Sequence, residues 1–187
     1  SRSDQFRLAV QCAIAPFYNE FIPNNMIHAL VTFIFETLHL KHVKHEGWRI
    51  IGVENPDSVA EHSLCAAQIA YILAKMEGAD AEKCATMLIW HDMPETRIWD
   101  LHRNASTYLT NKQQAEETAL HDQVSKLDFG DEIQNLFHEY EHGTTKEGII
   151  AKDADYLEQA FQARKYAQNW YSGTERWINN VGKRLQT

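Results

Sequence analysis

A histidine and an aspartate are neighbours at positions 91 and 92, in the segment IWHDMPET that covers residues 89–96. His62 lies earlier in the chain, within another stretch rich in apolar residues. Imidazole nitrogens and carboxylate oxygens are ligand atoms that suit Mn, Co, Fe or Zn. If His62, His91 and Asp92 face the same interior space, they can bind a divalent metal ion there.

The spacing around His62 predicts that its side chain points into the core. Apolar side chains recur with a helical period along residues 58–77, and the repeat includes Cys65, Ala66 and Ile69. His62 precedes Cys65 and Ala66 by three and four residues, which places it on their face of the helix. We therefore expect a buried histidine at this position.

The same pattern orients the His-Asp pair. In the helix expected at residues 80–92, His91 follows the apolar Leu88 by three residues and Asp92 follows it by four. Both side chains are therefore predicted to point inward. Pro94 disfavours a helical conformation at the residue before it, so this helix should end where His91 and Asp92 can reach a cavity.

Three inward polar side chains favour a metal site over separate structural roles. Taken singly, a buried histidine is more often a hydrogen-bonded core residue, and a buried aspartate is more often paired in a salt bridge. A carboxylate at a core position costs several kcal/mol unless a cation or hydrogen bonds compensate it. A divalent metal bound by His62, His91 and Asp92 would compensate all three at once.

A competing metal motif is HEYEH at residues 138–142, which matches the HExxH pattern of zinc metalloproteases. The apolar stripe of that helix includes Phe137, whereas His138 and His142 fall on the opposite side. Gly143 is expected to end the helix, and no third ligand is evident nearby in the sequence. We interpret HEYEH as a solvated helix face and keep the protease as the weaker alternative.

The elements that position these residues are predicted to be helices throughout. The apolar period is close to 3.6 along the chain, and no run alternates with the period of two that is typical of strands. Ser58 with Glu61 forms a capping box, and Gly78 is expected to close the helix that it starts. We expect an all-α bundle in a single domain, residues 1–187, with helices near 3–15, 24–45, 58–77, 80–92, 111–127, 131–142, 145–170 and 173–184.

Composition and charge exclude several kinds of partner. The formal net charge is −8, so the chain offers no basic face for a nucleic-acid backbone. The longest apolar stretch, MIHALVTFIFETLHL at residues 26–40, carries a glutamate and is too short to span a bilayer. Three cysteines without a CxxC pair fit reduced thiols better than disulfides. We therefore expect a cytoplasmic protein with a small-molecule ligand and no membrane or nucleic-acid partner.

The order of these residues resembles a known family. An isolated histidine, a His-Asp pair and a distant aspartate on a later helix are similar to the HD-domain metal-dependent phosphohydrolases. The blocks GWRIIGVENPDSVAEHSL (47–64), LIWHDMPET (88–96) and YEHGTTKEGIIAKDADYLEQA (140–160) resemble its 5′-deoxynucleotidase branch. The resemblance implies an HD-domain helical bundle, one divalent metal ion (Mn, Co, Fe, Zn or Mg) and hydrolysis of deoxynucleoside 5′-monophosphates to nucleoside and phosphate.

The resemblance also implies roles for single residues. It assigns the metal to His62, His91, Asp92 and Asp155, catalysis to Glu95 and Asp100, and phosphate binding to Arg49. It further implies a homodimer, which family members often form.

The fourth metal ligand has two candidates, because the segment KDAD contains Asp153 and Asp155. The apolar stripe through Ile150 and Ala154 places Asp153 on the apolar side and Asp155 at its edge. The family motif instead has the ligand three residues after a lysine, which matches Lys152 and Asp155. We predict Asp155 and keep Asp153 as the alternative.

Two departures from the family concern the loop of Asp100. Relatives commonly have glycine before this aspartate and proline two residues after it, whereas this chain has Trp99 and His102. We expect a bulkier loop and an altered pocket, with the chemistry at the metal unchanged. A non-catalytic HD module that binds a nucleotide is the remaining alternative, and the presence of Glu95 and Asp100 favours an enzyme.

Overall fold

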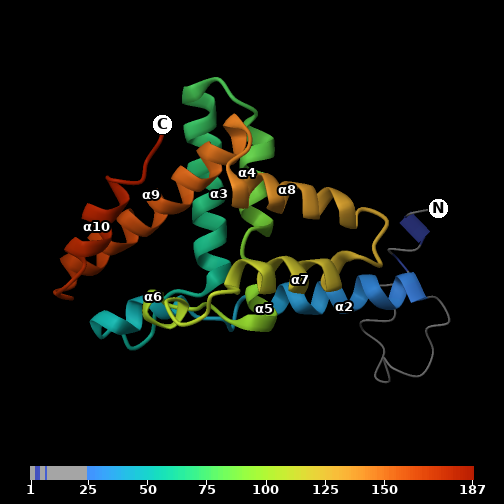
Figure 1. Ribbon diagram of the computed structural model, residues 1–187, viewed down its shortest axis with the longest axis horizontal. Coiled ribbons are helices and arrows are strands. Elements are labelled where there is room, and N and C mark those ends of the chain that lie inside the picture. Colours follow the sequence, from blue (N-terminus) through green and yellow to red (C-terminus); the bar gives the residue numbers. More distant parts are fainter. Residues whose placement is uncertain (1–2, 5–6, 8–24) are drawn as a thin grey trace.

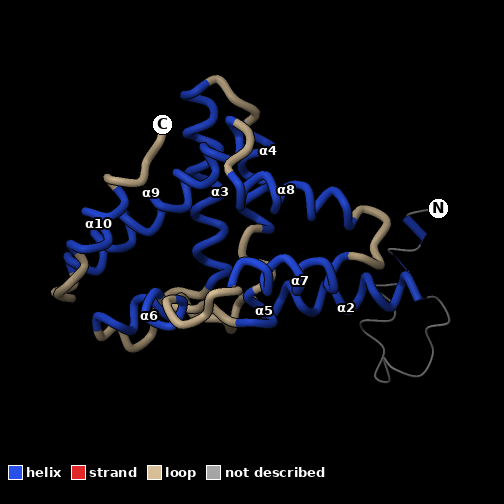
Figure 2. Tube along the Cα trace, viewed as in Figure 1, coloured by secondary structure: helices blue, strands red, loops and turns tan. Residues whose placement is uncertain are grey.

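The computed structural model describes residues 3–4, 7 and 25–187, so most of the helix predicted at residues 3–15 lies outside the described part of the chain. The described elements, coloured in Figure 2, are helices: α2 (Asn25–His39), the 3-10 helix η1 (Glu46–Ile51), α3 (Val59–Glu77), α4 (Ala81–Trp90), α5 (Glu95–Ile98), α6 (Arg103–Ser106), α7 (Lys112–Val124), α8 (Gly130–His142), α9 (Lys146–Gln168) and α10 (Glu175–Val181). Strand-like pairing within these residues is limited to an isolated bridge between Lys44 and Ser58. The predicted all-α class is confirmed.

Helix α3 begins and ends where the sequence predicts. The Ser58 side chain accepts a hydrogen bond from the Glu61 backbone N–H, and the Glu61 carboxylate accepts one from the Ser58 N–H at 2.7 Å. Gly78 closes the helix with a φ of 66°, in the left-handed region that glycine adopts without steric cost. The capping box thus fixes the start of the helix that carries His62.

The helix predicted at residues 24–45 is too long. Helix α2 ends at His39, and the following residues turn to pair with the segment before α3. The His45 N–H donates to the Asp57 carbonyl at 3.0 Å, and the Val59 N–H donates to the Val43 carbonyl at 2.9 Å. These tertiary hydrogen bonds satisfy backbone groups that a longer helix would have used.

Helix α4 ends at Trp90, two residues before the predicted boundary. His91 to Pro94 form a turn, and the short helices α5 and α6, which the sequence analysis did not predict, follow it. The prediction that Pro94 ends α4 beside the His-Asp pair is confirmed.

Helices α3, α4, α8 and α9 pack around a core of small side chains. Ala66, Ala70 and Ala74 of α3 and Ala151 and Ala154 of α9 are all fully inaccessible to solvent. Because alanine lets helix backbones approach closely, α3 packs against both α4 and α9, and Figure 1 shows α9 crossing α3 at an angle. This packing brings His62, in the first turn of α3, toward residues of two other chain segments.

Two further clusters complete the fold. Phe33 of α2 packs with Leu120 of α7 and Phe137 of α8, and Trp48 of η1 packs with Tyr166 of α9 and Trp177 of α10. The apolar stretch at residues 26–40 lies in α2 and the turn after it, and within the described part of the chain no helix is long and apolar enough to cross a membrane.

Candidate active site

The predicted polar residues meet where α3, the end of α4 and α9 come together. One ligand atom of each of His62, His91 and Asp92 can be chosen so that all three atoms lie within 4.8 Å of one another. His62 Nε2 lies 3.1 Å from Asp155 Oδ1, and His91 Nε2 lies 3.0 Å from Asp92 Oδ2. Four side chains from three segments thus converge in the protein interior.

Hydrogen bonds orient both histidines with Nε2 toward the cluster. His62 Nδ1 lies 2.6 Å from Glu158 Oε2. His91 Nδ1 donates to the Leu88 carbonyl at 2.9 Å, which places the proton on Nδ1. Such partners on the outer nitrogen are the usual support of a metal-binding imidazole, because they fix its tautomer and raise its basicity.

The structure separates the two candidate aspartates of α9. Both are buried, but Asp155 accepts hydrogen bonds from the Tyr140 hydroxyl at 3.0 Å and from Gln159 Nε2 at 3.0 Å, beside His62. Asp153 Oδ2 instead accepts the backbone N–H groups of Gln186 and Thr187 at 2.8 and 2.7 Å. Asp155 therefore lies in the cluster, and Asp153 binds the C-terminal residues.

The buried charges depend on one another. Burial alone would raise the pKa of Asp155, but its hydrogen bond to His62 and the charges of His62 and His91 hold that pKa well below its usual range. Burial alone would lower the pKa of His62, but Asp155 and Glu158 raise it well above the ordinary value. The cluster thus has the negative potential that a cation requires.

Glu95 and Asp100 form a second pair of carboxylates beside Asp92. Burial and the charges of Asp92 and Asp100 raise the pKa of Glu95 well above its ordinary value. The pKa of Asp100 is raised as well, chiefly by burial, although its Oδ2 accepts the Glu46 N–H at 2.6 Å. Raised carboxyl pKa values next to a metal-type cluster are typical of acid–base catalysts.

The loop before Asp100 has a backbone conformation that is unusual for a tryptophan. Trp99 has a φ of 64° and a ψ of 159°, a backbone conformation that is essentially confined to glycine. Trp99 is 52% exposed, and its ring makes an edge contact with His39. His102 caps α6 by accepting the Ala105 N–H at 3.1 Å. The loop therefore exposes the indole side chain of Trp99, where a glycine would expose only backbone.

Arg49, the predicted phosphate ligand, lies in η1. Its Nε is 2.8 Å from Glu46 Oε2, and its Nη1 donates to the Glu54 carbonyl at 2.9 Å, with the side chain 45% exposed. Arg49 thus contacts Glu46, whose backbone N–H binds Asp100. These contacts of Arg49 do not include His62, His91, Asp92 or Asp155.

Three residues near the cluster escaped the sequence analysis. Glu158 is three residues after Asp155 on α9, so helical spacing could have placed it on the same face. His45, whose ring centre is 4.7 Å from that of His62, and Lys112 on α7, whose charge acts on Glu95, gave no signal in the sequence. Both reach the site through tertiary packing alone.

The HEYEH segment forms the end of α8, and His138 and His142 are exposed as predicted. Glu139, the glutamate that would act as base in a protease, pairs with Lys83 Nζ at 2.7 Å and accepts the Thr145 hydroxyl at 3.0 Å. The expectation that no third ligand lies nearby is wrong, because Glu117 of α7 approaches both histidines. The sequence could not show this approach, since it depends on how α7 packs on α8.

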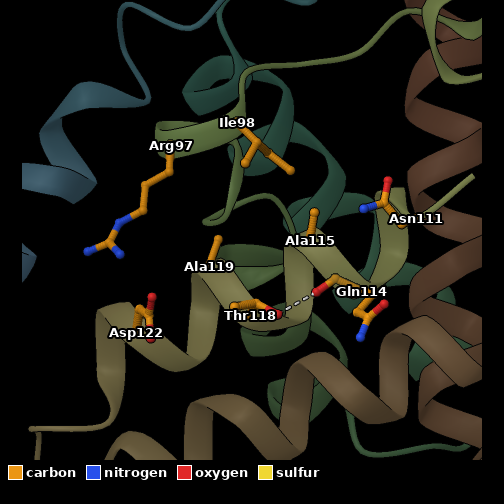
Figure 3. Close-up of a pocket in the computed structure, with 8 residues that line it drawn as sticks. All are labelled: Arg97, Ile98, Asn111, Gln114, Ala115, Thr118, Ala119 and Asp122. Carbon is orange, nitrogen blue, oxygen red and sulfur yellow. Dashed lines mark hydrogen bonds between the residues drawn. The ribbon is translucent and has the colours of Figure 1, made fainter. Parts of the chain in front are cut away.

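A surface hollow of about 400 Å³ lies between α5 and α7. Figure 3 shows its lining, from Arg97 and Ile98 on one side to Thr118 and Asp122 on the other. It contains none of the predicted site residues, so the hollow and the His-Asp cluster are separate features.

Comparison with a known family model agrees with the geometry of the His-Asp cluster. A family model described as "HD domain" matches residues 38–187, which include all the residues of the cluster. The chain belongs to the HD-domain family. The HD-domain phosphohydrolase fold and the enzyme class predicted from the sequence are thereby confirmed.

Individual relatives cover most of this HD-domain chain. A protein named 5′-deoxynucleotidase HDDC2 from Dictyostelium discoideum is 33% identical over 136 residues, which are 68% of this chain and 72% of the relative. The 5′-deoxynucleotidase hdd1 of Schizosaccharomyces pombe is 28% identical over 76% of this chain and 74% of its own length. A solved structure of a conserved hypothetical protein from Pyrococcus furiosus is 34% identical, with a TM-score of 0.73 over 82% of this chain and 90% of that one.

HD domains are metal-dependent, and the side chains of this chain fit a divalent cation. Two imidazoles present Nε2 while their Nδ1 atoms are bound elsewhere, and the carboxylates of Asp155 and Asp92 add negative charge. Nitrogen and oxygen ligands in this mixture are suited to Mn, Fe, Co, Zn or Mg.

Proposed function

We propose that this HD-domain phosphohydrolase removes the 5′-phosphate from deoxynucleoside 5′-monophosphates, releasing a nucleoside and inorganic phosphate. The observation that carries the proposal is the convergence of His62, His91, Asp92 and Asp155 beside the buried carboxyl of Glu95 and the partly buried carboxyl of Asp100. The substrate class rests on the relatives named 5′-deoxynucleotidase. A small dianionic substrate also fits an acidic chain better than a polynucleotide does.

In this proposal His62, His91, Asp92 and Asp155 are the metal ligands. A divalent cation bound there supplies a water of lowered pKa and offsets negative charge on the phosphoryl group. Glu158 and the Leu88 carbonyl hold the two imidazoles in the orientation that presents Nε2. Tyr140 and Gln159 do the same for the Asp155 carboxylate.

Glu95 transfers the proton and Asp100 positions the substrate. Water adds its oxygen to phosphorus and releases a proton, the bond from phosphorus to the sugar 5′ oxygen breaks, and that oxygen must receive a proton. We assign this donation to Glu95, because burial and the charges of Asp92 and Asp100 raise its pKa well above the ordinary value and so favour the protonated carboxyl that a general acid requires. The proton released by the water restores the donor for the next turnover. Asp100, fixed by the Glu46 N–H, orients the sugar end of the substrate.

The phosphate needs a cationic side chain, and we propose Lys112 in addition to Arg49. Burial lowers the pKa of Lys112, but its hydrogen bond to Glu116 and the charges of Glu116, Glu95 and Asp92 raise it overall, so it remains charged. Its Nζ lies 2.7 Å from Glu116 Oε1 and acts directly on Glu95, whereas Arg49 is paired with Glu46. The charge interaction of Lys112 with Glu95 supports a contact between Lys112 and a phosphate bound beside that residue.

Substituting the two cations separately tests this assignment. We expect Lys112→Ala to lower kcat/KM by about a hundredfold, the scale of a lost electrostatic contact to the reacting group. We expect Arg49→Ala to lower it less, because the guanidinium already has two protein partners. Steady-state kinetics with the exposed Lys126→Ala as control measures both effects. A larger loss in Arg49→Ala than in Lys112→Ala would contradict the role of Lys112.

A phosphate-release screen tests the substrate. Deoxy- and ribonucleoside mono-, di- and triphosphates are offered with Mn, Co and Mg, and products are separated by chromatography. We expect deoxynucleoside 5′-monophosphates to be the best substrates, with a free nucleoside as product. A preference for triphosphates, or for a phosphate that is not a nucleotide, would reject the 5′-deoxynucleotidase activity within the phosphohydrolase class. Binding without release from any phosphate would favour the non-catalytic nucleotide-binding module.

The organisation as a single domain and the homodimer remain predictions. The metalloprotease alternative finds no support, because the Glu139 carboxylate is paired with Lys83 and Thr145.

A further inference from the structure

A second group of metal-type side chains lies on the outer surface where α7 packs on α8. Glu117 of α7 and His138 and His142 of α8 can each present one ligand atom within 4.8 Å of the others. None of the three belongs to the His-Asp cluster of the active site. They lie on α7 and α8, whereas the residues of that cluster lie on α3, on α9 and in the turn after α4. The group therefore needs an explanation of its own.

The two histidines already point their rings toward each other. They are four residues apart on α8, which places them one turn apart on one face. Their Nδ1 atoms are 2.7 Å apart, and their ring centres are 4.1 Å apart in an edge-to-face arrangement. Two ligands on a tetrahedral zinc at about 2.0 Å are about 3.3 Å apart, so a small opening of this pair accommodates an ion.

Gln113 connects the third ligand to the pair. Its Nε2 lies 3.4 Å from Glu117 Oε1 and 3.4 Å from His142 Nε2. Gln113 is one turn before Glu117 on α7, so the amide holds the carboxylate on the side that faces α8. The carboxylate adds one negative charge to two imidazoles, which favours a divalent cation over none.

We propose that Glu117, His138 and His142 form a second, surface metal site that binds a zinc-class ion and joins α7 to α8. Two histidines and one glutamate are a common protein ligand set for zinc, and the fourth position is left to water. Gln113 supports the carboxylate from outside the ligand set. Glu139, the glutamate that would act as base in the HExxH pattern, is bound to Lys83 and Thr145, so we assign the site a structural role.

The position of the site predicts an effect of the bound ion on the stability of the fold. A bound ion ties residue 117 to residues 138 and 142 and so closes the chain segment that includes the α7–α8 turn. Cross-links of this kind stabilise a fold by restricting its unfolded chain and by binding only the native arrangement. We expect zinc to raise the thermal stability of the protein even when the active site cannot bind metal.

Zinc stoichiometry in an active-site variant isolates the surface site. The full chain carrying Asp92→Ala is stripped with a chelator and titrated with zinc by calorimetry and equilibrium dialysis. We expect about one zinc per chain and a rise in Tm in this background. Adding His142→Ala or Glu117→Gln should weaken this binding by about a hundredfold, since each removes a ligand. The matched control His121→Ala changes an α7 histidine that contacts Gln134 and lies outside the group, and it should leave binding unchanged.

The outcomes are decisive in both directions. Absence of zinc binding in the Asp92→Ala chain, or equal binding after either His142→Ala or Glu117→Gln, would overturn the surface site. Because catalysis is not measured, this result is independent of the substrate screen. A failed screen rejects the proposed activity, and a failed titration rejects the second metal.

Discussion

Replacing Asp92 by alanine is expected to remove the active-site metal ion and to lower phosphate release by at least about a thousandfold. Asp92 Oδ2 lies 3.0 Å from His91 Nε2 and 3.8 Å from His62 Nε2, so it is the carboxylate between the two imidazoles. Its loss leaves the site with less negative charge and fewer ligands. Elemental analysis measures the metal, with every protein also carrying His142→Ala so that the surface site adds nothing to the count.

Asp153→Ala is the matched control for this experiment. Asp153 is a fully buried aspartate near the site, but its carboxylate binds the backbone of Gln186 and Thr187. We expect this variant to keep its metal and to lose stability instead, by about 1–3 kcal/mol, because the C-terminal backbone N–H groups lose their buried acceptor. Metal lost from Asp153→Ala and retained in Asp155→Ala would show that the ligand assignment on α9 is wrong.

Replacing Glu95 by glutamine is expected to lower kcat by about a hundred- to ten-thousandfold while the metal stays bound. Glutamine keeps the size of the side chain and cannot give a proton to the leaving oxygen. Glu95 is buried, and burial with the charges of Asp92 and Asp100 raises its pKa, so its carboxyl can carry the proton that the reaction needs.

Single-turnover kinetics and metal content together measure the effect of Glu95→Gln. The exposed Glu82→Gln on α4 is the control for a change of charge away from the site. A Glu95→Gln enzyme with normal kcat would exclude proton transfer by this residue. Metal lost from that variant would place Glu95 among the ligands instead.

Local sequence patterns determined the helices that carry the site. The Ser58–Glu61 capping box and Gly78 bound α3 as predicted, and Pro94 ends α4 beside His91. The inward orientation of His62 and His91 followed from their spacing to neighbouring apolar residues, and both are nearly inaccessible. Caps and helical period are properties of residues within one or two turns, so the sequence alone contains them.

Tertiary structure decided the relations between segments. The helical wheel of α9 favoured Asp153, yet Asp155 meets His62, because the rotation of α9 is set by its packing against α3 and α4. The shortening of α2, the approach of His45 to His62 and the meeting of Glu117 with His138 and His142 likewise join residues far apart in the chain. These contacts depend on how whole helices approach one another, which no local spacing encodes. The sequence by itself therefore determined the helix ends and the inward orientation of His62 and His91, and only the packing of helices decided which residues meet.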